Sequence, residues 1–204
     1  GRQSAVFIQT KWGQQKAEIE TLRVRRFWSN SIGHWNVVPV ADILATMHHI
    51  GIDARLTYYR TGGISTYIRR LVRALESLDS TNYYTVFHSR KASDTLVQRA
   101  AHARLWTPCH HRFERIALSC ELARFRLDIL HSPDFIPPLR GARRHIITVH
   151  DLNFLHYPQF LTAESRRYYN GQIEAAVRQA HHILVDSRAT RDDLMHMLGV
   201  PSEK

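Results

Sequence analysis

The sequence predicts an α/β fold, in which a Rossmann-like parallel sheet carries helices on both faces. Short apolar runs alternate with longer segments of helical periodicity from residue 48 onward. Continuously apolar strands are typical of parallel sheets that are buried on both faces. Polar, small or titratable residues follow several of these runs, at the strand ends where such sheets bind ligands.

The alternating region begins with a strand and a helix on either side of a glycine pair. Apolar residues alternate with other residues from Ile50 to Ala54, which predicts the first strand. After Gly62 and Gly63, apolar residues recur with a period of about 3.6 residues through 64–78, as on one face of a helix. The β-rich segment "YYTVFHS" (83–89) predicts a second strand.

The rest of the chain continues the alternation. Residues 90–125 are expected to hold one or two helices and a short strand near Leu105. The remaining expected elements are strands at "LDILHS" (127–132), "HIITVHD" (145–151) and "HILVDS" (182–187), and a helix over 162–180. Ser187 is expected to cap a closing helix that ends at Gly199.

Residues 1–47 differ from the rest of the chain, with poor periodicity and three of the four tryptophans. We expect them to form an N-terminal extension without a packed role, poorly ordered or non-native, with a natural start near Met47. A Rossmann-like domain then spans residues 48–204.

The chain is basic, with 28 Lys and Arg against 18 Asp and Glu and a formal net charge of +10. The densest runs are short, such as "LRVRRF" at 22–27 and "RGARR" at 140–144. Nucleic-acid binders usually concentrate their charge on one motif with stacking aromatics, and none is found. The charge therefore favours phosphate-bearing small molecules or acidic lipid headgroups over nucleic acid.

The two cysteines, Cys109 and Cys120, are too few for a disulfide framework, and their spacing matches no common zinc site. We expect reduced thiols without a metal, which suits the cytoplasm. No apolar run reaches the roughly 20 residues that span a bilayer. Peripheral contact with the inner face of the membrane stays open.

The strand ends hold the candidate site residues. Gly62 and Gly63 either form a tight turn or let a phosphate approach the start of a helix. His150 and Asp151 follow the strand "IITV", where a histidine can donate a hydrogen bond to a sugar hydroxyl or stay a solvated side chain. His131 and Asp134 flank "SP" at the end of another strand. The prolines there are typical of a turn, and a binding role for His131 and Asp134 stays open.

Several motifs in order resemble a known family over about residues 49–204. They are "IGIDARL", "TGGISTYIRRLVRALESLD", "DILHSPDFIPPL", "IITVHDLNFLHYPQFLT" and "HHILVDSRATRDDLMHMLGVPSEK". Together they resemble the N-terminal domain of a retaining GT-B glycosyltransferase of glycosyltransferase family 4.

The resemblance implies two Rossmann-like domains with the active site between them, the first holding the acceptor and the second the nucleotide-sugar donor. By the same resemblance, Gly62 and Gly63 lie against the donor phosphates, His150 contacts the transferred sugar, and Asp151 shapes the same site as a second catalytic candidate. The other residues expected to bind substrate are Tyr67, His131, Asp134 and Ser187. The resemblance implies no metal and no cofactor, because helix dipoles and basic side chains stabilise the diphosphate leaving group.

The sequence departs from the family pattern at its end, "GVPSEK", where relatives continue into the second domain. The E-x7-E motif and the diphosphate-binding basic residues of that domain are absent. We therefore expect the acceptor half of a truncated hexosyl-type enzyme, inactive alone, whose full-length form glycosylates a glycan or lipid-linked saccharide.

Two other functions stay open. The chain can be a stand-alone, non-catalytic half that binds an acceptor or a partner subunit of a split glycosyltransferase. It can also be an NADP-binding Rossmann enzyme, because His88 and Arg90 end the second strand where a 2′-phosphate would lie. The absence of a G-x-G-x-x-G motif weakens that second reading.

Overall fold

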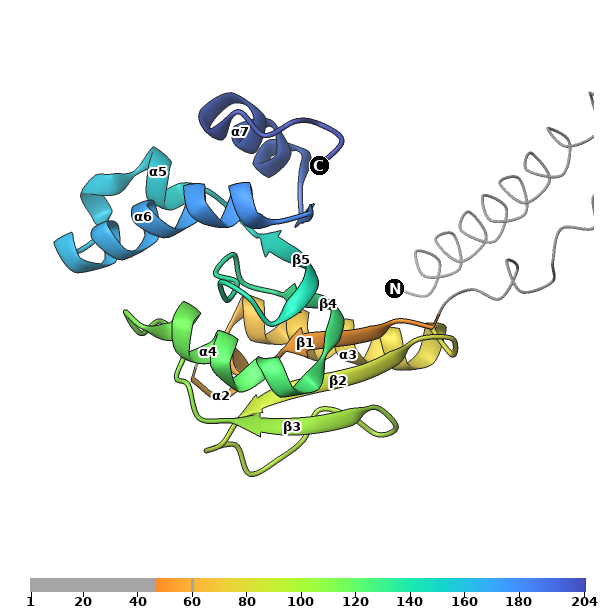
Figure 1. The fold of residues 1–204 in the computed structure, drawn as a ribbon. Coiled ribbons are helices and arrows are strands. Elements are labelled where there is room, and N and C mark those ends of the chain that lie inside the picture. The colour runs from red at the N-terminus through yellow and green to blue at the C-terminus, as the bar shows by residue number, and fades with distance from the viewer. Residues whose placement is uncertain (1–46, 60) are drawn as a thin grey trace, which may run out of the picture. The chain divides into compact units, whose positions relative to one another are not determined.

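The computed structural model describes residues 47–59 and 61–204 (Figure 1). The expected extension lies outside the described residues except for Met47, whose side chain is exposed. Within the described part of the chain, no helix combines the length and the apolar character needed to cross a bilayer.

Six parallel strands form one sheet in the order β3-β2-β1-β4-β5-β6. The strands are β1 (His49–Asp53), β2 (Tyr83–Ser89), β3 (Ala101–Leu105), β4 (Leu127–Ser132), β5 (Ala142–Val149) and β6 (His182–Val185). The strand order reverses at β1, which pairs with β2 on one side and with β4 on the other. This order confirms the Rossmann-like prediction, and its switch point lies between β1 and β4.

The helices connect these strands largely as the apolar periodicity predicts. They are α2 (Leu56–Tyr59), α3 (Gly63–Leu78), α4 (Glu114–Leu122), α5 (Asn153–His156), α6 (Ala163–Gln179) and α7 (Arg188–Leu198), with the 3-10 turns η2 (Ala123–Phe125) and η3 (Pro158–Phe160). Ser187 caps α7 by accepting from the backbone N–H of Thr190, and Gly199 ends it in the left-handed conformation. Both ends of the closing helix are therefore confirmed.

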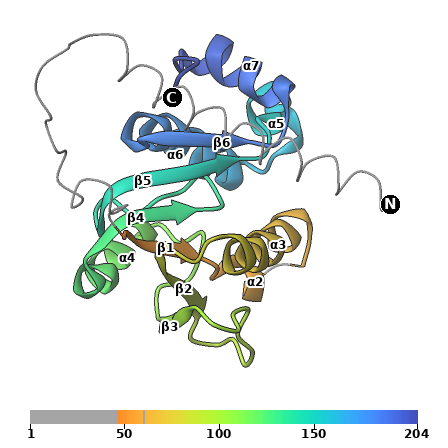
Figure 2. The ribbon, with the colours of Figure 1, turned by 90° about the vertical axis from the view of Figure 1, so that its right-hand side faces the viewer.

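Both faces of the sheet are covered, as neighbouring residues of β2 show. Val86 packs in a cluster with Ile68 and Val72 of α3, whereas Phe87 packs in another with Leu118 of α4. Successive side chains of a strand point to opposite faces, so α3 and α4 must lie on different sides. Figure 2 shows these two helices on opposite sides of the strands.

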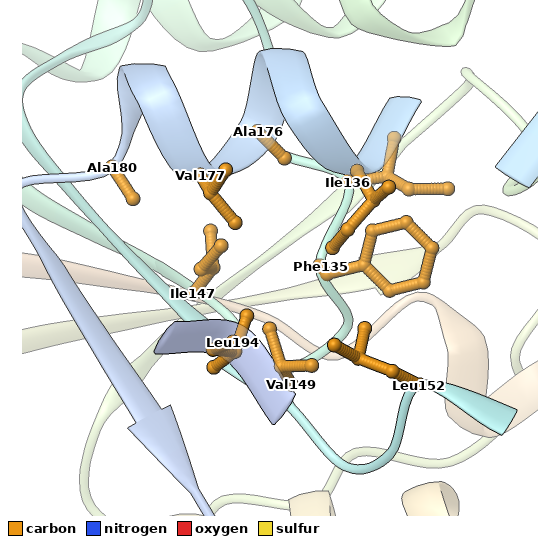
Figure 3. Close-up of a cluster of buried hydrophobic side chains, with 10 residues drawn as sticks. Phe135, Ile136, Ile147, Val149, Leu152, Ala176, Val177, Ala180 and Leu194 are labelled. Carbon is orange, nitrogen blue, oxygen red and sulfur yellow. The ribbon is translucent and has the colours of Figure 1, made fainter. Parts of the chain in front are cut away.

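A third cluster joins β5 to the C-terminal helices. Ile147 of β5 lies between Val177 of α6 and Leu194 of α7 (Figure 3). Val149, two residues along the strand, belongs to the same cluster and is fully buried. This packing fixes the carboxyl end of β5, after which His150 follows.

Three strands differ in their bounds from the prediction, and β1 (His49–Asp53) is shifted by only one residue at each end. β5 begins at Ala142 and ends at Val149, because backbone pairing with β4 extends over Arg143 and Arg144 despite their exposed side chains. β6 ends at Val185. His150 and Asp151, and likewise Asp186 and Ser187, therefore lie in the loops that follow these strands.

Candidate functional site

A cavity of about 160 Å³ lies beyond the carboxyl ends of β4 and β5, and is called the crevice cavity below. It is lined by Leu56, Ile64, His110, Asp134, Phe135, His150, Asp151, Phe154 and Tyr169. Three predicted site residues, Asp134, His150 and Asp151, thus share one cavity. Ligands of open parallel sheets bind at this end of the strands.

His150 is held at both ring nitrogens. Its Nδ1 lies 2.6 Å from a carboxylate oxygen of Asp186, and its Nε2 lies 2.9 Å from the carbonyl oxygen of Pro133. Both partners are hydrogen-bond acceptors, and which ring nitrogen donates depends on the tautomer. The two contacts fix the orientation of the ring beside the cavity.

A chain of hydrogen-bonding groups lies behind His150. The Tyr67 ring meets the His150 ring edge to face, with centroids 5.1 Å apart, and its hydroxyl lies 3.3 Å from Oγ1 of Thr148. Thr148 Oγ1 also lies 2.8 Å from Nε2 of His131. Burial, with a smaller contribution from the His150 charge, lowers the pKa of His131 to about 4. His131 is therefore a neutral supporting group near neutral pH.

The two aspartates of the cavity have different surroundings. The Asp134 carboxylate lies 2.9 Å from Nε2 of His110 and accepts the backbone N–H of Phe135. Asp151 is exposed and accepts the backbone N–H of Asn153 at 3.0 Å, which shapes the turn into α5. Asp151 can therefore face a ligand without losing its structural role.

The glycine pair forms the start of α3. Gly62 is the N-cap residue, and Gly63 is the first residue of the helix. A Cβ atom added at either glycine would meet nothing within 4 Å, so the fold itself does not require glycine there. The open space lies at the positive end of the helix dipole, where an anion can approach the backbone.

Ser187 supports the site from a distance. Its hydroxyl accepts the Thr190 N–H at 3.1 Å, and Thr190 in turn donates from Oγ1 to the His150 carbonyl at 3.0 Å. α7 is thereby tied to the backbone of the site histidine. Ser187 does not line the crevice cavity, and its contact with substrate stays a prediction.

A buried ion network lies at the end of β1. Arg55 is fully buried, donates from Nε and Nη2 to both carboxylate oxygens of Asp53, and donates from Nη2 to Glu114 at 2.8 Å. The backbone N–H of His110 donates to the other oxygen of Glu114 at 2.6 Å. Through His110 the network reaches Asp134 and the crevice cavity.

A smaller cavity of about 20 Å³ lies beside this network, at the switch point between β1 and β4. The buried hydroxyl of Ser132 lines it and has no hydrogen-bond partner in the part of the chain that the structure describes. The space is close to that of one water molecule, which would satisfy this hydroxyl.

Sequence reasoning missed three residues of the site. His110 does not follow a predicted strand, and in the structure it is half-buried and paired with Asp134. Asp186 directly follows β6, so the strand-end rule that selected His150 also points to it. Arg55 also follows a strand, but nothing in the sequence distinguishes it from a solvated arginine.

The residues considered for metal binding and for NADP binding lie in surroundings that suit neither. Among residues 47–59 and 61–204, no three side chains of the types His, Cys, Asp and Glu converge as metal ligands would. Arg90 stacks over Trp106 at 4.2 Å from the ring centroid, and His88 is 2% exposed. Both residues of the NADP reading are thus occupied elsewhere.

The chain was compared with models of known protein families. A family model described as Glycosyltransferase Family 4 matches residues 61–204, which is more than half of the chain. The matched segment begins beside the glycine pair and includes all of the predicted site residues. The comparison with curated proteins gives no match.

Proposed function

The chain belongs to glycosyltransferase family 4, and on this basis we propose that it forms the acceptor-side half of a retaining GT-B enzyme. The enzyme transfers a sugar from a nucleotide-sugar donor to a glycan or a lipid-linked saccharide. A second Rossmann-like domain would hold the nucleotide. The observation that carries the proposal is the fixed His150 at the crevice cavity, within a chain of this family.

The start of α3 fits the donor diphosphate. The first backbone N–H groups of a helix lack intrahelical partners and carry partial positive charge. Gly62 and Gly63 leave open space there, so a diphosphate can reach these groups without meeting a side chain. Stabilising the leaving diphosphate in this way requires no metal and no cofactor.

His150 fits the transferred sugar. In our proposal a sugar hydroxyl replaces the Pro133 carbonyl as the acceptor from Nε2, while Asp186 holds Nδ1 and keeps the ring in place. Asp151 borders the same cavity and accepts from an acceptor hydroxyl.

The test is sugar transfer by the full-length protein with a panel of nucleotide sugars. We expect His150→Ala to lower kcat by about 10²-fold, the usual effect of losing one electrostatic group at a reacting centre. His196→Ala is the matched control, because His196 is exposed on α7 and its ring contacts the backbone carbonyl of Asp192 in the same helix. Equal rates for wild type and His150→Ala would contradict the proposed role of His150.

The non-catalytic alternative makes a different prediction for the same panel. A stand-alone binding half would bind acceptor or partner but would release no nucleoside diphosphate with any donor. Producing the chain together with a second Rossmann-like domain and repeating the transfer assay distinguishes the two cases. A split enzyme would then transfer sugar, whereas a binding module would not. We favour the enzyme because the fixed His150 ring and the open start of α3 lie at the same end of the sheet.

A further inference from the structure

A groove of about 600 Å³ lies at the amino ends of β4 and β5, at the opposite end of these strands from the crevice cavity. It is lined by Ser119, Cys120, Ala123, Arg126, Leu127, Arg140, Gly141, Ala142 and Arg143, and is called the arginine groove below. The set contains three arginines and no carboxylate. Part of the basic run at 140–144 therefore gathers, with Arg126, around one concave surface.

The positive charge of the arginine groove is largely uncompensated. The guanidinium groups of Arg126 and Arg140 have no hydrogen-bond or ion-pair partner among the described residues. Arg143 has one contact, 3.3 Å to Asp128, and its side chain is 84% exposed. Guanidinium forks without partners match the paired oxygens of phosphate and diphosphate groups.

The backbone holds these arginines in place. Gly141 has a φ of +118°, and a Cβ there would come within 2.9 Å of the Leu122 Cβ, so the loop lies tightly against the end of α4. The adjacent Arg140 N–H donates to Ser119 Oγ at 3.0 Å. Arg126 adopts the left-handed conformation, with a φ of 50°, which is costly for a residue with a side chain.

We propose that the arginine groove binds a soluble ligand that carries a phosphate or diphosphate group. Its volume lies within the range of small-molecule sites. None of its lining residues is a large apolar side chain that is exposed, unlike the lining of surfaces that insert into membranes. The groove shares no lining residue with the crevice cavity, so the proposal stands independently of the proposed transferase function.

Cys120 provides a reporter for occupancy that needs no enzymatic assay. Its thiol is exposed and lines the groove, whereas burial raises the pKa of Cys109, the other cysteine of the chain. A neutral maleimide should therefore modify Cys120 first, because the thiolate is the reactive form. The measurement is the rate of this modification at rising pyrophosphate, with ionic strength held constant by sodium chloride.

We expect pyrophosphate to slow the modification in a saturable manner. In the double variant Arg126→Gln, Arg140→Gln, the concentration for half protection should rise by at least about tenfold, because two charge-assisted contacts are lost. The matched control Arg70→Gln, Arg73→Gln removes the same charge from the exposed side of α3 and should keep the wild-type value. Thermal melting of each variant checks that it is folded.

Three results would overturn the proposal. Protection that never saturates, or protection that falls equally in both double variants, would indicate general screening of a basic surface. In a parallel experiment, vesicles that contain anionic phospholipid replace pyrophosphate, and the rate of Cys120 modification is measured again. Protection by vesicles alone, with none by pyrophosphate, would indicate a membrane contact in place of a soluble ligand.

Discussion

The guanidinium of Arg55 is fully buried, and its charge is balanced inside the protein. Asp53 accepts from it through both carboxylate oxygens, Glu114 accepts at 2.8 Å, and the carbonyl of Thr107 accepts at 2.7 Å. Burial is the largest single influence and lowers the pKa of Arg55, but the charges of its acidic neighbours and the hydrogen bonds to Asp53 together outweigh it and raise that pKa. Burial also raises the pKa of Glu114, although Arg55 partly offsets the effect. The three groups therefore depend on one another.

Removing Arg55 should be strongly destabilising. Arg55→Met would leave the carboxylates of Asp53 and Glu114 buried without their cation, which typically costs about 3–5 kcal/mol of the free energy of unfolding. Urea denaturation measures this loss. Arg73→Met, at an exposed arginine, should change stability by less than about 0.5 kcal/mol. A loss below about 1 kcal/mol in Arg55→Met would show that the network contributes little.

The same network shows why part of the site escapes sequence reasoning. Arg55 and Glu114 are 59 positions apart, and both are charged residue types that usually lie at the surface. Their burial follows from the strand order, which brings the end of β1 beside the loop before α4. His150, by contrast, directly follows an apolar strand, and the sequence alone predicts its place at a ligand-binding edge.

The observed bounds of an element agree with the predicted ones where its side chains face the core. β2 and β4 match their predicted bounds because both are nearly continuous apolar or buried runs. The start of β5 was missed because Arg143 and Arg144 are exposed, while backbone pairing sets the strand. α2 and α5 have four residues each, too short for a helical period to register.

Helix α7 gives the clearest test at the level of one element. Ser187→Ala removes the acceptor for the Thr190 N–H and should lower the free energy of unfolding by about 1 kcal/mol. Ser187→Gly should cost only a few tenths of a kcal/mol, because glycine leaves the helix end open to water. Denaturant titration of both variants makes the comparison. Equal losses would indicate that the hydroxyl does not stabilise α7 through the cap.

On the scale of the whole molecule, three buried histidines share the sheet. They are His88 of β2, His131 of β4 and His145 of β5, and each is at most 6% exposed. Burial is the main cause that lowers the pKa of each to about 4, with neighbouring positive groups adding to it. The folded protein therefore keeps these rings neutral at pH values where an unfolded chain protonates them.

This difference predicts that the protein loses stability as the pH falls from 7 to 5. Below about pH 6.5 the unfolded chain binds protons at these histidines, whereas the folded protein resists until near pH 4. The free energy of unfolding should drop by about 2 kcal/mol for each histidine over that interval. Glu114, with its raised pKa, opposes the change, because its folded carboxyl takes up a proton before the unfolded one.

Urea denaturation at pH 7, 6 and 5 measures the loss, and His88→Leu isolates one contribution. Nε2 of His88 is buried and has no hydrogen-bond partner among residues 47–59 and 61–204, so leucine removes a titrating ring without taking a partner from that atom. The variant should lose about 2 kcal/mol less than wild type between pH 7 and pH 5. Parallel losses in the two proteins would mean that His88 is protonated in the folded state as readily as in the unfolded chain.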